Sequence, residues 1–138
     1  VVGAGGTVYI ADSRRMRIRT YSPGGEPIAS FGGFGTDPGR FDGVTSLALD
    51  ADGNLYTTDY LNRRVQVFSP EGEVIGIWNA ADSGLEGFAR LWSVAVGPDG
   101  RVYVVDEDPE GGGVAVLTTP AYIAPEGSPA APVASPAT

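Results

Sequence analysis

Short apolar stretches rich in β-branched and aromatic side chains alternate along this chain with turns rich in Gly, Asp and Pro. Near the middle, four of these stretches are predicted as strands: Ser46–Leu49, Leu55–Thr58, Arg64–Phe68 and Glu73–Trp78. Asp and Gly favour the tight turns between strands because they tolerate positive φ or bond their own backbone. No segment shows a helical period of apolar positions. The pattern therefore predicts an all-β antiparallel meander.

The same pattern returns at a fixed spacing. The segment Gly6–Asp12 (GTVYIAD) recurs 47 residues later as Gly53–Asp59 (GNLYTTD), and again 47 residues later as Gly100–Asp106 (GRVYVVD). Between residues 3 and 46, 12 of 44 positions are identical to the residue 47 positions further on. A four-stranded unit of about 40 to 50 residues in tandem is typical of a β-propeller blade, whose faces must be covered by neighbouring blades.

The repeats divide the chain into three units and a tail. We predict propeller blades at about residues 1–43, 44–91 and 92–119, which form a partial or oligomer-completed propeller. The third blade comes into alignment only after two extra residues in Glu110–Gly113, and its fourth strand is expected near Ala121–Ile123. Residues 120–138 are rich in Pro and Ala and carry one charge, so we predict an extended C-terminal tail. The Ser and Thr residues of this tail also permit O-glycosylation.

Composition excludes several classes of protein. The 138 residues contain no Cys and no His, which excludes disulfides, the usual zinc sites, thiol nucleophiles and histidine-based triads. The net charge is -8, and all nine cationic residues are Arg. A field of this sign repels phosphate backbones, so we expect no nucleic-acid partner. No apolar run reaches the roughly 20 residues that a membrane-spanning helix needs.

Three stretches around the second repeat resemble the NHL-repeat family. They are Gly35–Phe41, Leu47–Asp59 and Asn62–Phe68, which resemble the family pattern G-x-G-x-F, D-x-D/N-G, apolar-Tyr-x-x-Asp and N-x-R-[VI]-x-x-F. The resemblance extends from residue 1 to about residue 118, although the third repeat lacks the Asn-x-Arg element. It implies a β-propeller, commonly of six blades, of which this chain supplies about three. Some propellers similar to this family are lyases with metal-bound His, an activity that a chain without His does not carry over.

The recurring aspartates Asp12, Asp59 and Asp106 have two interpretations, a metal or catalytic site and a structural role. An Asp at a strand end accepts hydrogen bonds from the free N–H groups of the following turn. Arg17 and Arg64 follow the first two aspartates by five residues and are placed to pair with them across a hairpin. Repetition at equivalent places favours the structural role for all five residues.

Two charged clusters and two tryptophans are further candidates. Arg14, Arg15, Arg17 and Arg19 form either a patch for an anion or acidic partner or, as we favour, a solvated strand. On a strand, residues 15, 17 and 19 share one face. The acidic loop Asp106–Glu110 is either a calcium site or, as we favour, a solvated turn. Trp78 and Trp92 fall at blade junctions, where we expect them to pack.

These observations favour a non-catalytic module for protein interaction or self-assembly, with no enzymatic activity, no metal and no cofactor. Its partners would be other copies of itself or another protein, without membrane insertion. The absence of an initiator Met, the Pro/Ala-rich tail and the absence of Lys favour an extracellular or cell-surface location. Three blades predict self-association, either as two chains in a six-bladed ring or as a filament. The alternative is a fragment of a larger secreted propeller enzyme, of lyase or hydrolase type, whose active-site residues lie outside this chain.

Overall fold

The computed structural model describes residues 1–79, 89–107, 111–117 and 135–136. Its strands are β1 (Val8–Asp12), β2 (Arg17–Tyr21), β3 (Pro27–Gly32), β4 (Val44–Leu49), β5 (Leu55–Asp59), β6 (Arg64–Phe68), β7 (Val74–Asn79), β8 (Leu91–Val96), β9 (Val102–Asp106), β10 (Gly113–Leu117) and β11 (Ser135–Pro136). The described residues contain no helix, and hence none long and apolar enough to cross a membrane. The prediction of an all-β fold is confirmed.

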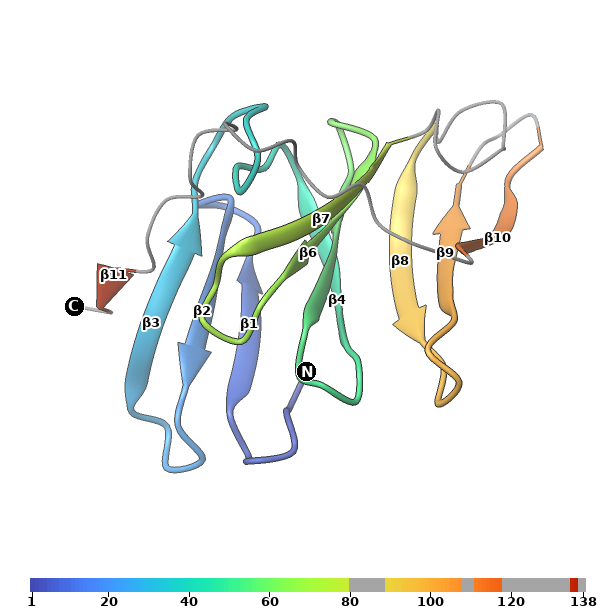
Figure 1. Cartoon of the computed structure of the whole chain (residues 1–138). Coiled ribbons are helices and arrows are strands. Elements are labelled where there is room, and N and C mark those ends of the chain that lie inside the picture. Colours follow the sequence, from blue (N-terminus) through green and yellow to red (C-terminus); the bar gives the residue numbers. More distant parts are fainter. Residues whose placement is uncertain (80–88, 108–110, 118–134, 137–138) are drawn as a thin grey trace.

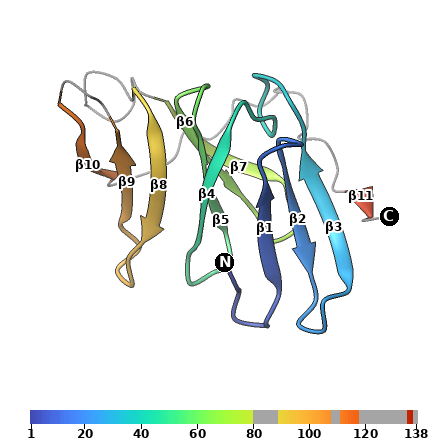
Figure 2. The same ribbon diagram turned by 180° about the vertical axis from the view of Figure 1, so that it is seen from behind.

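The strands form three antiparallel sheets that stand side by side (Figures 1 and 2). Their strand orders are β1-β2-β3-β11, β4-β5-β6-β7 and β10-β9-β8. Val2 pairs with Val8 and thereby takes, beside β1, the innermost place that β4 and β8 take in the other two sheets. We call these units blade 1 (Val2 and β1–β3), blade 2 (β4–β7) and blade 3 (β8–β10). Residues 47 apart in blades 1 and 2, and in the first two strands of blade 3, are called equivalent.

Blade 2 lies between the other two blades and buries both of its faces. One core, between blades 1 and 2, consists of Tyr9, Ile18, Phe31, Phe41, Val44, Leu55 and Phe68. The other, between blades 2 and 3, consists of Ala48, Val65, Val67, Trp78, Leu91, Val94, Val102, Val104, Ala115 and Leu117. Alternate residues of each strand of blade 2 point to opposite neighbours, which is why β6 is buried along its whole length. The prediction that the repeats are propeller blades covering one another is confirmed.

The two described residues of the tail lie at the outer edge of blade 1. Ser135 pairs with Ser30 and Pro136 with Ala29, so β11 extends the sheet beyond β3. Pairing of this kind covers the unpaired N–H and C=O groups of an edge strand. The strand expected near residues 121–123 and the rest of the predicted extended tail lie outside the described residues.

Candidate functional site

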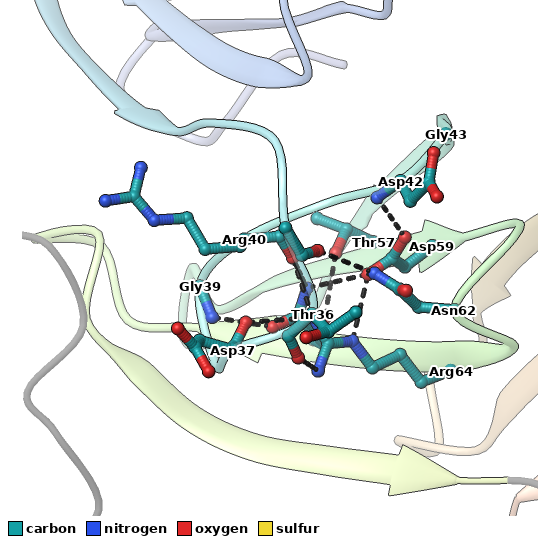
Figure 3. A network of polar contacts seen from close by, with 12 residues as sticks. Thr36, Asp37, Gly39, Arg40, Asp42, Gly43, Thr57, Asp59, Asn62 and Arg64 are labelled. Atoms are coloured by element: carbon teal, nitrogen blue, oxygen red, sulfur yellow. Dashed lines mark hydrogen bonds and ion pairs between the residues drawn. The ribbon is translucent and has the colours of Figure 1, made fainter.

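A buried network of polar side chains joins β5 and β6 of blade 2 to the connection that arrives from blade 1 (Figure 3). Asp59 ends β5 and faces Arg64, the first residue of β6. Arg64 Nε donates to Asp59 Oδ2 over 2.9 Å, and both side chains are buried. Asn62 Nδ2 donates to the same oxygen, and the backbone N–H of Asp42 donates to Oδ1. The carboxylate of Asp59 is therefore shared between its own hairpin and the incoming connection.

The guanidinium of Arg64 binds the carbonyl oxygens of this connection. Its Nη1 donates to the carbonyl of Thr36 over 2.7 Å, and its Nη2 donates to the carbonyls of Asp37 and Arg40 over 2.9 and 2.8 Å. Asn62 adds a bond to the carbonyl of Gly35. The planar guanidinium suits this task because it offers five donors in a fixed geometry.

Gln66 completes the network, although the sequence analysis did not identify it. Its Oε1 accepts the backbone N–H of Gly39 over 2.8 Å, and its Nε2 donates to the carbonyl of Arg40 over 2.7 Å. In the sequence, the sign of its role is a polar amide side chain between two valines of an apolar strand. All five residues of this strand are buried. Within the described residues, every buried side-chain polar atom of the molecule has a hydrogen-bond partner. The network is thus complete in itself and braces the joint between blades 1 and 2.

The equivalent aspartates of the other blades have different partners. Asp106 Oδ1 and Oδ2 accept the backbone N–H groups of Arg90 and Ala89, which precede β8. Asp12 Oδ2 instead lies 3.3 Å from Arg17 Nε and 3.5 Å from Arg15 Nη1. Desolvation raises the pKa of Asp12, but the hydrogen bonds and charges of Arg17 and Arg15 outweigh it, so its pKa lies below the ordinary value.

The arginine cluster is divided between a turn and a strand. Met16 has φ of 52°, and β2 begins only at Arg17, so Arg15 lies in the turn and does not share the strand face predicted for it. Arg14 is exposed in the same turn. Arg19 lies over the ring of Tyr21, with its Cζ 5.1 Å from the ring centroid. The structure therefore leaves only Arg17 and Arg19 together on the outward face of blade 1.

The acidic loop is only partly described. Asp106 and Glu107 belong to the described residues, whereas 108–110 lie outside them. In the part of the chain that the structure describes, no three Asp or Glu side chains gather closely enough to hold a metal ion.

A second candidate lies where the innermost strands β4 and β8 begin. Both strands carry a register irregularity at the same place, between Val44 and Leu47 in β4 and between Leu91 and Ser93 in β8. A bulge redirects a side chain and is frequent beside active sites. The redirected residues are the equivalent pair Thr45 and Trp92, and both are exposed. Thr45 is exposed although blade 2 has a neighbour on each side and its hydroxyl reaches blade 3, so this position stays accessible beside the contact between blades 2 and 3.

Trp92 differs from our expectation. We predicted that Trp78 and Trp92 both pack at blade junctions, and Trp78 is indeed buried and stacks on Tyr56 with 5.8 Å between ring centroids. Trp92 is 56% exposed and meets the ring of Tyr60 edge-on at 6.3 Å. The bulge in β8 turns its indole out of the core, a local irregularity that the strand pattern does not reveal.

Hydroxyl groups hold these strand ends together. The backbone N–H of Ser46 donates to Thr58 Oγ1 over 2.9 Å, and Thr58 Oγ1 lies 2.7 Å from Thr45 Oγ1. Thr45 Oγ1 in turn donates to the carbonyl of Leu91 over 3.2 Å. This chain of bonds crosses from β5 through β4 to β8. It fixes the positions of Thr45 and of the strand that carries Trp92.

Tyr56, a residue whose pKa is strongly raised, lies at the opposite end of blade 2. Tyr56 donates its hydroxyl to Asp50 Oδ2 over 3.2 Å. Burial, the charge and hydrogen bond of Asp50 and the charge of Asp52 together raise the pKa of Tyr56 to about 12. Asp50 also accepts backbone bonds from Asp52 and Asn54. This arrangement stabilises the β4–β5 turn.

Comparison with known proteins gives one family and one similar fold. The family described as SMP-30/Gluconolactonase/LRE-like region matches residues 3–84. No curated protein matches the chain. A solved structure described as "Streptogramin B lyase structure" aligns with a TM-score of 0.61 and 12% identity, over 87% of this chain and 39% of that chain. At this identity the likeness concerns the fold, and the present chain spans well under half of the other protein.

The family match corrects the prediction about enzymatic activity and confirms only the coarser part of the prediction about the family. The prediction that the protein has no enzymatic activity is wrong, because the matching family takes its name in part from an enzyme, gluconolactonase. The absence of His, Cys and a carboxylate pair from these 138 residues does not exclude an enzymatic activity of the protein. The prediction of a propeller family is confirmed, whereas the finer resemblance to NHL repeats stays a prediction. With more than half of its residues matched, the chain belongs to the SMP-30/gluconolactonase/LRE-like family.

Proposed function

We propose that this chain forms three blades of a propeller enzyme of hydrolase or lyase type that opens cyclic esters. The substrate would bind where the innermost strands β4 and β8 begin. Membership of a family named for a lactonase supports the enzyme class. The similar fold of a protein described as a lyase is compatible with either reaction type. In this proposal, the described residues supply a binding wall, and blades outside this chain supply the groups that react.

The exposed side chain of Trp92 is the observation that carries this proposal. A bulge at the start of the innermost strand β8 redirects it. Its indole and the ring of Tyr60 form an edge-to-face pair that is open to solvent. Ligand sites combine aromatic walls with a few polar groups. Here the hydroxyl of Thr45 lies 3.2 Å from the carbonyl of Leu91, the residue before Trp92. Aromatic side chains offer a large contact area to the apolar part of a substrate.

The two reaction types differ in mass balance. A hydrolase adds water across the ester, so that the acyl–oxygen bond breaks and an acid and an alcohol form. A lyase breaks the alkyl–oxygen bond while a neighbouring carbon loses a proton, so that a carboxylate and an alkene form without water. The product of hydrolysis is heavier than the substrate by one water, whereas the product of elimination has the same mass.

Tryptophan fluorescence tests the binding wall directly. Glucono-δ-lactone and an alkyl-substituted γ-lactone would be titrated into the 138-residue chain, with Trp78 as the buried internal reference. We expect saturable quenching that is lost in Trp92→Phe and retained in Leu61→Ala, which changes an exposed apolar residue in the β5–β6 turn. Quenching that persists in Trp92→Phe, or no saturable change with either lactone, would overturn the proposal. Mass analysis of lactone incubated with a protein that contains this chain together with the further blades then separates hydrolysis from elimination.

A further inference from the structure

Thr45 occupies a position of the repeat whose chemistry changes from one blade to the next. In the innermost strand of blade 3 the equivalent residue is Trp92, and both side chains are exposed. The residue before this position is buried and apolar in both blades, and the residue after it is a serine in both. These neighbours are Val44 and Ser46 in blade 2, and Leu91 and Ser93 in blade 3. The neighbours serve the blade itself, whereas the exposed position between them differs and is available to a ligand.

A second hydroxyl, on the adjacent strand β5, supports the side chain of Thr45. Thr58 is 0% exposed, and its Oγ1 lies 2.7 Å from Thr45 Oγ1. Thr58 Oγ1 also accepts the backbone N–H of Ser46 over 2.9 Å. In blade 3 the equivalent of Thr58 is Val105, on the strand beside Trp92. Blade 2 thus places a pair of hydroxyls where blade 3 places a pair of apolar side chains.

The hydrogen of the Thr45 hydroxyl is already bound within the protein. A hydroxyl has one hydrogen to donate and two lone pairs that accept. Thr45 Oγ1 donates to the carbonyl oxygen of Leu91 over 3.2 Å, so Thr58 supplies the hydrogen of the 2.7 Å contact. If that contact ran in the opposite direction, the hydrogen of Thr45 would lie on Thr58 Oγ1 and would again be bound. In both arrangements Thr45 keeps a lone pair and has no free hydrogen.

This acceptor stays accessible when the blades are packed together. Blade 2 is covered by blade 1 on one side and by blade 3 on the other, and Thr45 is nevertheless exposed. Its bond to Leu91 crosses from β4 to β8, which lie side by side (Figure 1), and so holds the hydroxyl beside the strand that carries Trp92. The position of the acceptor is therefore fixed before a ligand arrives, which lowers the entropic cost of binding.

We propose that Thr45 is a specificity-determining residue that accepts a hydrogen bond from the ligand and offers none. It selects cyclic esters that carry a donor, either a hydroxyl or an amide N–H, beside the part of the ring that contacts Trp92. An ester carbonyl has only lone pairs and therefore cannot pair with Thr45. This inference rests on the proposed function, because it requires the ligand to lie on the binding wall formed by Trp92 and Tyr60.

Pairs of lactones that differ in a single hydrogen-bond donor test this assignment. α-Hydroxy- and β-hydroxy-γ-butyrolactone are each compared with the fluoro analogue, which is similar in size but has no hydrogen to donate. Binding to the unmodified 138-residue chain is measured by the quenching of Trp92 fluorescence. We expect at least one hydroxylactone to bind about three- to tenfold more tightly than its fluoro analogue, which is the effect of one hydrogen bond.

Variants of Thr45 assign this preference to its hydroxyl. Thr45→Val and Thr45→Ala remove the acceptor, so the dissociation constants of the two ligands in each pair should become about equal. Thr45→Ser keeps the hydroxyl and should keep the preference. The matched control is Thr7→Val, which removes a hydroxyl at the position equivalent to Asn54, at the opposite end of the blade, and should leave the preference unchanged. Circular dichroism verifies that each variant keeps its β-sheet content.

The outcomes separate this inference from the proposed function. Equal affinity of each hydroxylactone and its fluoro analogue in the unmodified chain would overturn the role of Thr45, although quenching of Trp92 by both would still support the proposed function. A preference that Thr45→Val and Thr45→Ala retain would overturn it as well. Absence of saturable quenching by all four lactones would overturn the proposed function and this inference together. The comparison in the unmodified chain needs no variant, so it decides even where a substitution prevents folding.

Discussion

Asp59 and Arg64 form a buried ion pair, 2.9 Å from Nε to Oδ2, in which each partner also binds the backbone of a connection from the neighbouring blade. Asp12 and Arg17 are the equivalent pair in blade 1 and lie 3.3 Å apart at a more exposed place. The same two residue types, at the same spacing, therefore serve an internal joint in one blade and an open face in another. Stability should respond to the two pairs very differently.

Asp59→Ala should lower the free energy of unfolding by about 3 to 5 kcal/mol, because it leaves the Arg64 charge buried without its partner. Chemical denaturation followed by circular dichroism measures this loss. Asp12→Ala is the matched control and should cost much less, because Arg17 and Arg15 can turn to solvent. Equal losses in the two variants would show that the buried pair does not brace the joint.

Gln66→Leu should lower the free energy of unfolding by about 1 to 3 kcal/mol. The substitution nearly preserves volume but leaves the N–H of Gly39 buried without its acceptor, and a buried unsatisfied group costs about this much. The carbonyl of Arg40 keeps its bond from Arg64. Arg19→Leu, at the equivalent position on the open face of blade 1, serves as the control. A loss in Arg19→Leu as large as that in Gln66→Leu would contradict this account.

The repeat, the strands and the pairing of Asp12 with Arg17 and of Asp59 with Arg64 could be predicted from the sequence, because all of these depend on local pattern. The strand Arg64–Phe68 has the bounds predicted for it. What Gln66 does was not predictable, since its partners Gly39 and Arg40 are 27 and 26 residues away. Nor was the exposure of Trp92, because a bulge of one residue reverses the direction of a side chain without changing the apolar pattern. Absence of His and Cys misled the prediction about activity, which depends on the whole protein.

Gly32→Ala should destabilise the end of blade 1 by about 1 to 3 kcal/mol. Gly32 has φ of 113°, and an added Cβ would lie 2.9 Å from Arg17 Cα, the carbonyl oxygen of Met16 and Phe41 Cε2. Two of these atoms belong to the backbone and cannot rotate away. Gly5→Ala, where a Cβ would meet nothing within 4 Å, should change stability by about 0.5 kcal/mol or less. Thermal melting of the two variants separates local strain from a general effect of removing glycine.

Tyr56 should make the protein less stable as the pH rises from 10 to about 12. Its pKa in the folded chain is raised to about 12, so the folded state keeps the proton while the unfolded state loses it near pH 10. Stability that depends on this proton is complete below pH 10 and is lost as the pH rises through the folded pKa. Denaturation midpoints across this range should fall less steeply in Tyr56→Phe than in the unmodified chain.

Blade 3 provides the control for this titration. Tyr103 is equivalent to Tyr56, but Gly97 stands where blade 2 has Asp50, so the hydrogen-bonded carboxylate is missing there. Tyr103→Phe should therefore leave the alkaline loss of stability close to that of the unmodified chain. If Tyr56→Phe instead keeps the full pH dependence while tyrosinate absorbance shows the other tyrosines ionising in the same range, the alkaline transition does not arise at the Asp50–Tyr56 hydrogen bond.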